Sequence, residues 1–410
     1  MKLLLNKKNL YSLIIFINTG WLIICSGSQY FRNFNSLPTH VFLIFISIMT
    51  FLIYKKISKK NIAVCICILC ILLFHALVTY RDKIDNNMFI FVITIFVLFI
   101  FCSNINIADY KKMYIYFMIA EVLLSLVCFL VCWFGKMNTL PGYDEVIVRY
   151  SGGYNIIYLT PYYTIGWLST GGFFYRNAGI FWEPGAHAIY IDLALLFLLD
   201  ATDLKKSTTH RKLEIVILIL GILTTLSTTG YIVLTLSFLY YATKSKKRKD
   251  VKRNILVIIV TFMFLIITAL YGDVFDKIIY RQGSFGTRYT DTVEGAKLVL
   301  SNWLFGKGMF NNISDALKKV GINNISNGFI ELMIRLGIPL TMTYALMFHK
   351  GIKRMFGAKE LGIFILDIIF LIYLNSESIS TFPVIMIFFF FFRQEKDNAS
   401  SKLLQYGRSN

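Results

Sequence analysis

Long apolar runs separated by short polar or basic stretches dominate the chain. The runs are continuous rather than alternating, so they predict membrane helices and not the strands of a β-barrel. We therefore expect an all-α, polytopic integral membrane protein in which residues 1–410 form a single transmembrane domain. The pattern predicts about 12 helices, at 10–25, 41–54, 61–80, 88–102, 113–134, 186–199, two within 213–243, then 254–271, 327–348 and two within 361–392.

Two of the apolar runs are too long for one ordinary span. The first is interrupted near Ser227-Thr228-Thr229-Gly230 and the second near Asn375-Ser376-Glu377-Ser378. Each run is expected to form two short helices whose turn is buried among other helices, because exposed backbone is not tolerated in lipid. The short helices could instead be re-entrant, which would change the number of spans.

Basic residues between the apolar runs set the predicted orientation. Blocks such as 55–60 and 244–249 mark the cytoplasmic side by the positive-inside rule, which puts both termini and the tail 393–410 in the cytoplasm. Two large loops, 135–184 and 272–326, are then periplasmic. Orientation and lipid headgroups account for the net charge of +19, so we expect membrane lipids and no nucleic acid as partners.

Composition narrows the possible chemistry. The chain is 56% hydrophobic and 16% charged, with a mean hydropathy of +0.63. All seven cysteines lie in or at the ends of apolar runs, and we interpret them as small buried hydrophobes. No cluster has metal-ligand spacing and no phosphate-binding glycine loop occurs, so we expect neither a metal nor a cofactor.

A charged pair precedes the apolar run 188–199. Arg176 and Glu183 are seven residues apart, and Pro184 and Gly185 follow at once. Proline is well tolerated in the first turn of a helix, so Glu183 is predicted at a helix N-terminus, where the helix dipole favours a negative charge. The pair can serve chemistry at the mouth of a membrane helix or form a structural ion pair.

Other ionisable residues have two interpretations each. His187 lies one helical turn after Glu183 and can shuttle a proton or simply be packed. Asp192 and Asp367 lie within predicted spans, where carboxylates are functional suspects or link helices by hydrogen bonds. Glu331 and Arg335 have the spacing of a local salt bridge on one helix.

Both predicted outer loops supply arginines. These are Arg149 and Arg176 in the first loop and Arg281 and Arg288 in the second. Arginine forks match phosphate oxygens, and the tyrosines of the first loop suit stacking on sugar rings. An anionic lipid headgroup that carries a sugar would use both features. Alternatively, these residues anchor the loops at the headgroup level.

Three stretches resemble one family. They are Arg176-x-x-Gly179-x-Phe181-x-Glu183-Pro184-Gly185, then Leu226 to Tyr231, and finally Arg288 through Trp303-Leu304-Phe305-Gly306-x-Gly308 to Asn327-Gly328-Phe329 and Gly337. Together with the helix layout, they resemble the superfamily of Wzy-type O-antigen polymerases and O-antigen ligases, which are bacterial membrane glycosyltransferases.

The resemblance implies a GT-C-like fold in the bacterial cytoplasmic (inner) membrane and a metal-independent transfer at its periplasmic face. The donor would be an undecaprenyl-pyrophosphate-linked oligosaccharide and the acceptor a sugar hydroxyl of another lipid-linked repeat unit. A regulator of chain length would be a further partner. Residues implied in catalysis are Glu183, Arg176 and Arg288; those implied in substrate binding are Arg149, Arg281, His187, Asn327 and Tyr289.

The chain departs from the ligases of this family at the exit of the second loop. Ligases typically have His-Asn there, whereas this chain has Ser326-Asn327, which favours a polymerase. A ligase stays open as an alternative. A lipid-linked oligosaccharide flippase or transporter would place cations along a cavity within the helices, whereas here they gather in the two loops.

Overall fold

A computed structural model describes residues 7–28, 44–45, 47–48, 50–51, 57–79, 86–135, 154–157, 160–167, 173–201, 208–244, 283–311, 313–322, 325 and 327–391. Most of the predicted span 41–54, the span 254–271 and the tail 393–410 lie outside these residues. Within them are the helices α1 (Lys7–Cys25), α4 (Lys59–Thr79), α5 (Asn86–Asn104), α6 (Ile107–Gly135), α8 (Pro184–Ala201), α9 (Thr209–Thr225), α10 (Thr228–Lys244), α13 (Gly283–Ser301), α14 (Ser314–Lys319), α15 (Gly328–Phe356), α16 (Glu360–Ser376) and α17 (Pro383–Phe390).

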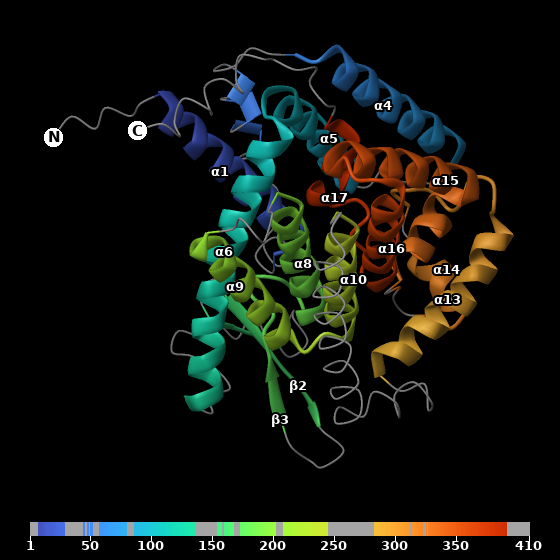
Figure 1. The fold of residues 1–410 in the computed structure, drawn as a ribbon. Coiled ribbons are helices and arrows are strands. Elements are labelled where there is room, and N and C mark those ends of the chain that lie inside the picture. The colour runs from blue at the N-terminus through green and yellow to red at the C-terminus, as the bar shows by residue number, and fades with distance from the viewer. Residues whose placement is uncertain are drawn as a thin grey trace.

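The described helices have the apolar character predicted for a polytopic membrane protein. Four of them, α4, α6, α8 and α15, are long and apolar enough to cross a membrane, and two further apolar stretches, Leu10–Cys25 and Met88–Asn104, are shorter. Helix α8 is the centre of the bundle: every residue from 186 to 199 is buried, and α6, α9 and α10 pack around it (Figure 1). The prediction of a polytopic helical membrane protein is confirmed.

Both predicted interruptions are real turns. Helices α9 and α10 are joined at Leu226-Ser227, where Leu226 adopts a left-handed conformation with φ of 49°. Seventeen residues per helix span only about 25 Å, less than the ~30 Å hydrocarbon core. The second turn separates α16 from α17, and the two turns meet, because Ser376 Oγ donates a hydrogen bond to Thr229 Oγ1 at 3.2 Å.

Helix α15 is kinked after its first two and a half turns. Gly337 has φ of 76°, and Pro339 follows inside the helix. Pro339 has no N–H to donate, and the change in backbone direction at Gly337 points the N–H of Ile338 away from the helix. The carbonyl groups of Ile334 and Arg335 therefore lack the hydrogen bonds that the N–H groups four residues later would normally donate to them.

The Trp303–Gly308 turn of the second long loop replaces these lost hydrogen bonds. The bonds run from Ile338 N–H to Trp303 O (2.7 Å), from Lys307 N–H to Ile334 O (2.7 Å) and from Gly308 N–H to Arg335 O (3.0 Å). Close backbone contact requires glycine on both sides: a Cβ on Gly306 would lie 2.6 Å from Arg335 O. The loop is thus joined to the middle of a membrane helix.

Gly337→Ala is expected to destabilise the protein more than Gly321→Ala. Both glycines have φ near 76°, but a Cβ on Gly337 would lie 2.5 Å from Leu304 O, whereas nothing lies within 4 Å of one on Gly321. A positive φ alone costs an alanine ~1–3 kcal/mol, and Gly321→Ala measures that cost without a clash; at Gly337 the ψ of 170°, which essentially only glycine adopts, adds to the effect of the close contact. Thermal unfolding in detergent would measure both; equal losses would contradict the close contact.

A small antiparallel sheet lies in the first long loop, where the sequence predicts no strands. Its strands β1 (Tyr154–Ile157), β2 (Thr160–Trp167) and β3 (Phe173–Arg176) are ordered β1-β2-β3, and Tyr163 pairs with Arg176. The sheet lies at one end of the bundle (Figure 1). β3 ends at Arg176, so the sheet leads into the segment that precedes α8.

A buried charge cluster closes the opposite end of α8. Lys111 Nζ lies 2.7 Å from Asp200 Oδ2 and donates to Met355 O at 2.7 Å. Lys244 Nζ and the Tyr240 hydroxyl reach the other carboxylate oxygen of Asp200, at 3.0 and 2.7 Å. The Lys111 and Asp200 side chains are only 9% and 13% exposed, so this cluster connects α6, α8, α10 and α15 inside the protein.

Candidate active site

Arg176 and Asn177 bind the end of α9. Arg176 Nε–H donates to Thr225 O at 2.8 Å. Asn177 N–H donates to Thr224 O at 2.9 Å, and its Nδ2 lies 3.1 Å from both Thr224 Oγ1 and Ser125 Oγ. The first and second motif segments, about 50 residues apart in the chain, therefore form one structure.

Gly179 lies against a buried Glu121–His187 pair. Nε2 of His187 is 2.8 Å from Glu121 Oε2, and both side chains are excluded from solvent. Ile180 N–H donates to Glu121 Oε1 at 3.2 Å. Gly179 has φ of 54°, and a Cβ there would overlap Glu121 and lie 2.7 Å from His187 Nε2. The glycine lets the motif backbone close over this pair.

His187 is held by the motif and not presented to solvent. Its Nδ1 lies 3.3 Å from Asn177 O, and its ring stacks on Phe181 with centroids 5.5 Å apart. Phe181 also stacks on Tyr190, at 4.1 Å. His187 is fully buried and holds the motif in place. This agrees with the interpretation of His187 as a packed side chain.

Glu183 lies directly before α8, as the sequence predicts. Its carbonyl accepts the N–H of His187 at 3.1 Å, which is the first hydrogen bond of the helix. Its side chain is half-buried. Within the described part of the chain, the Glu183 carboxylate forms no hydrogen bond or ion pair, so the alternative of a structural ion pair with Arg176 is not what this geometry shows.

The turn between α16 and α17 adds a second carboxylate. A Cβ on Gly185 would lie 3.2 Å from Glu377 Oε1 and 3.4 Å from Glu183 Oε1, so the two carboxylates flank one glycine at the start of α8. Glu377 is 7% exposed, and its backbone packs against Gly328 at the start of α15. The same turn bonds to α15 through Ser378 and Glu331.

The second long loop reaches this site through Asn327, which caps α15. Asn327 Oδ1 accepts the N–H groups of Phe329 and Ile330, both at 3.1 Å, and its Nδ2 lies 3.1 Å from Thr292 Oγ1 on α13. This shows a structural role for Asn327, a residue proposed to bind substrate. Glu331 and Arg335 form the predicted local ion pair at 2.8 Å.

The remaining sequence candidates are placed only in part. Arg288 and Tyr289 lie near the start of α13; Tyr289 is 41% exposed, and the side chain of Arg288 is outside the described set. Arg149 and Arg281 lie outside the described residues altogether. Of the predicted set, Arg176, Glu183 and His187 lie on one continuous segment at the start of α8, and Asn327 precedes Gly328, which packs against Glu377.

A comparison with family models matches the same region. Residues 214–345 match the model described as O-antigen ligase. The matched range runs from α9 into α15 and includes the α9–α10 turn, the described second loop and Asn327. The match covers about a third of the chain and is consistent with the superfamily of O-antigen polymerases and ligases.

The family match indicates a class of chemistry. The matched family implies a membrane enzyme of the glycosyltransferase type that acts on a lipid-linked oligosaccharide. A search of curated proteins found no match. The Arg176–Gly185 segment precedes the matched range, but its hydrogen bonds to Thr224 and Thr225 join it to that range.

Two residues of the candidate site do not stand out in the sequence. Glu121 lies within the predicted span 113–134, where a carboxylate is itself a signal. Glu377 was noted only as part of a helix break. Each becomes significant through contacts with the Arg176–Gly185 segment, to which neither is close in sequence.

The two intramembrane aspartates differ. Asp367 Oδ2 lies 2.8 Å from His349 Nδ1 and so links α16 to α15, as the helix-linking interpretation expects. Asp192 is fully buried in α8, and neither carboxyl oxygen has a hydrogen-bond partner among the described residues. Across the described ranges, no three His, Cys, Asp or Glu side chains gather as metal ligands.

Proposed function

We propose that this chain is a surface-polysaccharide (O-antigen) polymerase. It transfers an undecaprenyl-pyrophosphate-linked oligosaccharide onto a sugar hydroxyl of another lipid-linked repeat unit, at the periplasmic face of the bacterial inner membrane. The observation that carries this proposal is the Glu183 carboxylate, half-buried and without a protein partner among described residues, at the start of the central helix.

Glu183 acts on the acceptor. The acceptor hydroxyl oxygen attacks the anomeric carbon of the donor, the bond from that carbon to the pyrophosphate oxygen breaks, and the hydroxyl proton passes to the Glu183 carboxylate. A positioned general base of this kind typically raises the reaction rate about 10²–10⁴-fold. Glu377, which flanks the same glycine, orients the acceptor with Glu183.

Positive charge acts on the leaving group. Arg176 lies beside the α9–α10 turn, and we assign Arg288, Arg281 and Arg149 from the two loops to the same pyrophosphate. The N-terminal ends of α8, α10 and α15 also meet at this turn region, and helix N-termini favour anions. Such fixed charges stabilise the pyrophosphate anion as it leaves. The proposal uses no metal.

A ligase is the second candidate. It is favoured by the description of the matching family model, whereas Ser326-Asn327 in place of His-Asn favours the polymerase. Polymerase and ligase would share the donor and differ in the acceptor. A flippase would instead move the donor across the membrane without breaking the glycosyl bond.

The surface polysaccharide ladder on a gel separates these functions. Cells that lack the gene should show one repeat unit on the final acceptor, and wild type should restore the ladder. Arg176→Ala should fail to restore it, because the charge opposite the leaving group is lost. Arg211→Ala, at the far end of α9, is the matched control and should restore it.

Other outcomes would overturn the proposal. A bare acceptor in the deletion strain would indicate a ligase or a flippase, and repeat units accumulating on the cytoplasmic side would indicate a flippase. An unchanged ladder in the deletion strain would remove support for any role in this polysaccharide. Full rescue by Arg176→Ala, with normal protein level, would exclude Arg176 from the site.

A further inference from the structure

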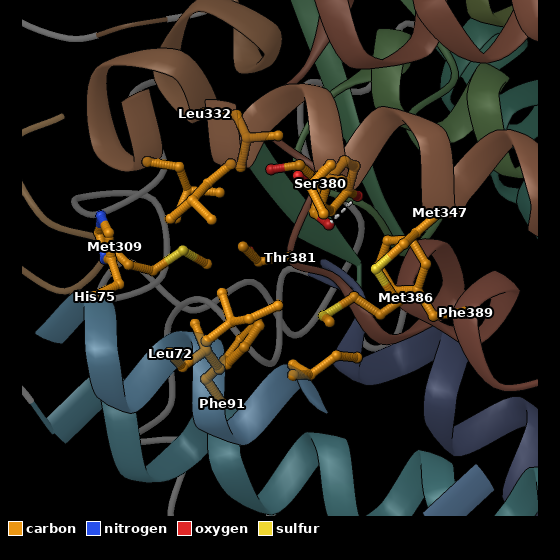
Figure 2. A pocket seen from close by; sticks show the side chains of 16 residues that line it. Leu72, His75, Phe91, Met309, Leu332, Met347, Ser380, Thr381, Met386 and Phe389 are labelled. Carbon is orange, nitrogen blue, oxygen red and sulfur yellow. Dashed lines mark hydrogen bonds between the residues drawn. The ribbon is translucent and has the colours of Figure 1, made fainter. Parts of the chain in front are cut away.

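An apolar groove lies between α4, α5, α15 and α17, outside the carboxylate site. Figure 2 shows its lining: Leu72 and His75 come from α4, Phe91 from α5, and Met386 and Phe389 from α17. The cavity volume is about 80 Å³. Its lining is almost wholly apolar. The groove therefore suits a hydrocarbon chain and not a sugar ring, whose hydroxyl groups would lack hydrogen-bond partners there.

The groove opens between two membrane spans. Its sides are formed by α4 and α15, both long and apolar enough to cross a membrane. On the α15 side, Leu340 and Met347 are half-buried and Thr343 is exposed. On the α4 side, Ile71 and Leu72 are likewise half-buried. A chain can therefore enter sideways from the lipid.

The α16–α17 turn forms part of the groove wall. Ser380 and Thr381 line it there, and the Tyr344 hydroxyl donates to Ser380 O at 2.6 Å. These residues lie within four positions of Glu377, whose carboxylate flanks Gly185 beside Glu183. One short turn thus contributes both to the apolar groove and to the candidate active site.

Flexible side chains make the groove adaptable. Met309 from the second long loop, Met347 from α15 and Met386 from α17 all contribute to its surface, and methionine adjusts readily to irregular apolar ligands. Near Met309, His75 forms a hydrogen bond with Phe305 O at 2.8 Å. That bond attaches the second loop to α4 and closes this side of the groove.

We infer that the groove holds the isoprenoid chain of the lipid-linked donor, close to its pyrophosphate end. This inference rests on the proposed function only for the lipid-linked substrate. An isoprenoid chain lying between α4 and α15 would have its first units at Ser380 and Thr381. Its charged head would then lie on the Glu377 side of the turn, toward Glu183 and Arg176.

Photolabelling of the full-length protein tests this inference. The probe is geranylgeranyl pyrophosphate with a diazirine on the chain, added to protein in dioleoylphosphatidylcholine nanodiscs, with labelled residues mapped by mass spectrometry. Label is expected on the α15 segment 340–347 and on Met309 or Met386, and unlabelled undecaprenyl pyrophosphate should displace it. Leu340→Trp fills the groove and should reduce labelling about tenfold, which corresponds to ~1.4 kcal/mol of binding.

The control is Leu346→Trp, on the same helix but 63% exposed and outside the groove, which should leave labelling unchanged. If Leu340→Trp does not fold, Ile71→Trp, compared with the exposed Leu73→Trp, repeats the comparison on α4. The inference would be overturned if label were spread evenly over the exposed faces. It would also be overturned if a diazirine phosphatidylcholine labelled the groove equally and undecaprenyl pyrophosphate did not displace it.

The labelling requires no glycan and no turnover, so it is independent of the ladder. A ligase outcome on the gel would overturn the polymerase proposal and leave a labelled groove intact. Conversely, a normal ladder without labelling of the groove would overturn only the inference that the groove holds the isoprenoid chain.

Discussion

Glu183→Gln is expected to lower the rate of glycosyl transfer by about 10²–10⁴-fold, the usual contribution of a positioned general base. Glutamine keeps the size of the side chain at the start of α8 but cannot take the proton of the acceptor hydroxyl. The protein level should not change, because the carboxylate supports no described hydrogen bond. The rate would be measured in membrane vesicles supplied with lipid-linked repeat units.

Glu360→Gln is the matched control, because Glu360 is an exposed carboxylate at the start of α16. It should leave the rate unchanged. Glu377→Gln provides a second comparison within the site. Full activity in Glu183→Gln together with loss of activity in Glu377→Gln would move the base to Glu377. Full activity in both variants would show that neither carboxylate takes part in the reaction.

Lys111→Ala is expected to destabilise the fold by about 3–5 kcal/mol, the range found when one partner of a buried ion pair is removed. The Asp200 carboxylate would then lose its closest cation, Met355 O its donor, and the Phe356 ring a cation 4.5 Å from its centroid. Thermal and denaturant unfolding in detergent would show the loss. At the expression level, less folded protein should reach the membrane.

Lys112→Ala is the control for this change, because Lys112 is next in the chain and exposed. Its loss should be below about 1 kcal/mol, as for other exposed charges. Replacing both partners, Lys111→Met with Asp200→Leu, should recover much of the stability, because apolar pairs often substitute for buried ion pairs. Equal effects of Lys111→Ala and Lys112→Ala would contradict a buried role for Lys111.

Local patterns in the sequence were enough to predict most helices. Continuous apolar runs predicted the spans, and polar interruptions predicted both turns, one of which the structure places at Leu226-Ser227. Pro184 and Gly185 correctly predicted the start of α8. The sheet β1–β3 was not predicted, because strand formation depends on neighbouring strands more than on intrinsic preference. Tyrosine and glycine in that loop fit several conformations equally well.

The site was predictable only where its residues are close in sequence. Arg176 and Glu183 were recognised from their spacing and from the proline that follows. Glu121 was not, because it lies 66 residues from His187 and their contact depends on how α6 packs against α8. His187 shows the same limit: its helical spacing from Glu183 was correct, but burial turns its ring toward Glu121.

The joining of Trp303–Gly308 to the kink of α15 constrains how segments of such proteins can be exchanged. A chimera with the second loop of a relative would ordinarily be cut where the loop ends, near Asn327. Here that cut would separate the donor groups of Lys307 and Gly308 from the carbonyls of Ile334 and Arg335. Grafts that extend through Ile338 and Pro339 should fold better than grafts that end at Asn327. The loop and the first part of α15 should therefore be transferred together in a chimera.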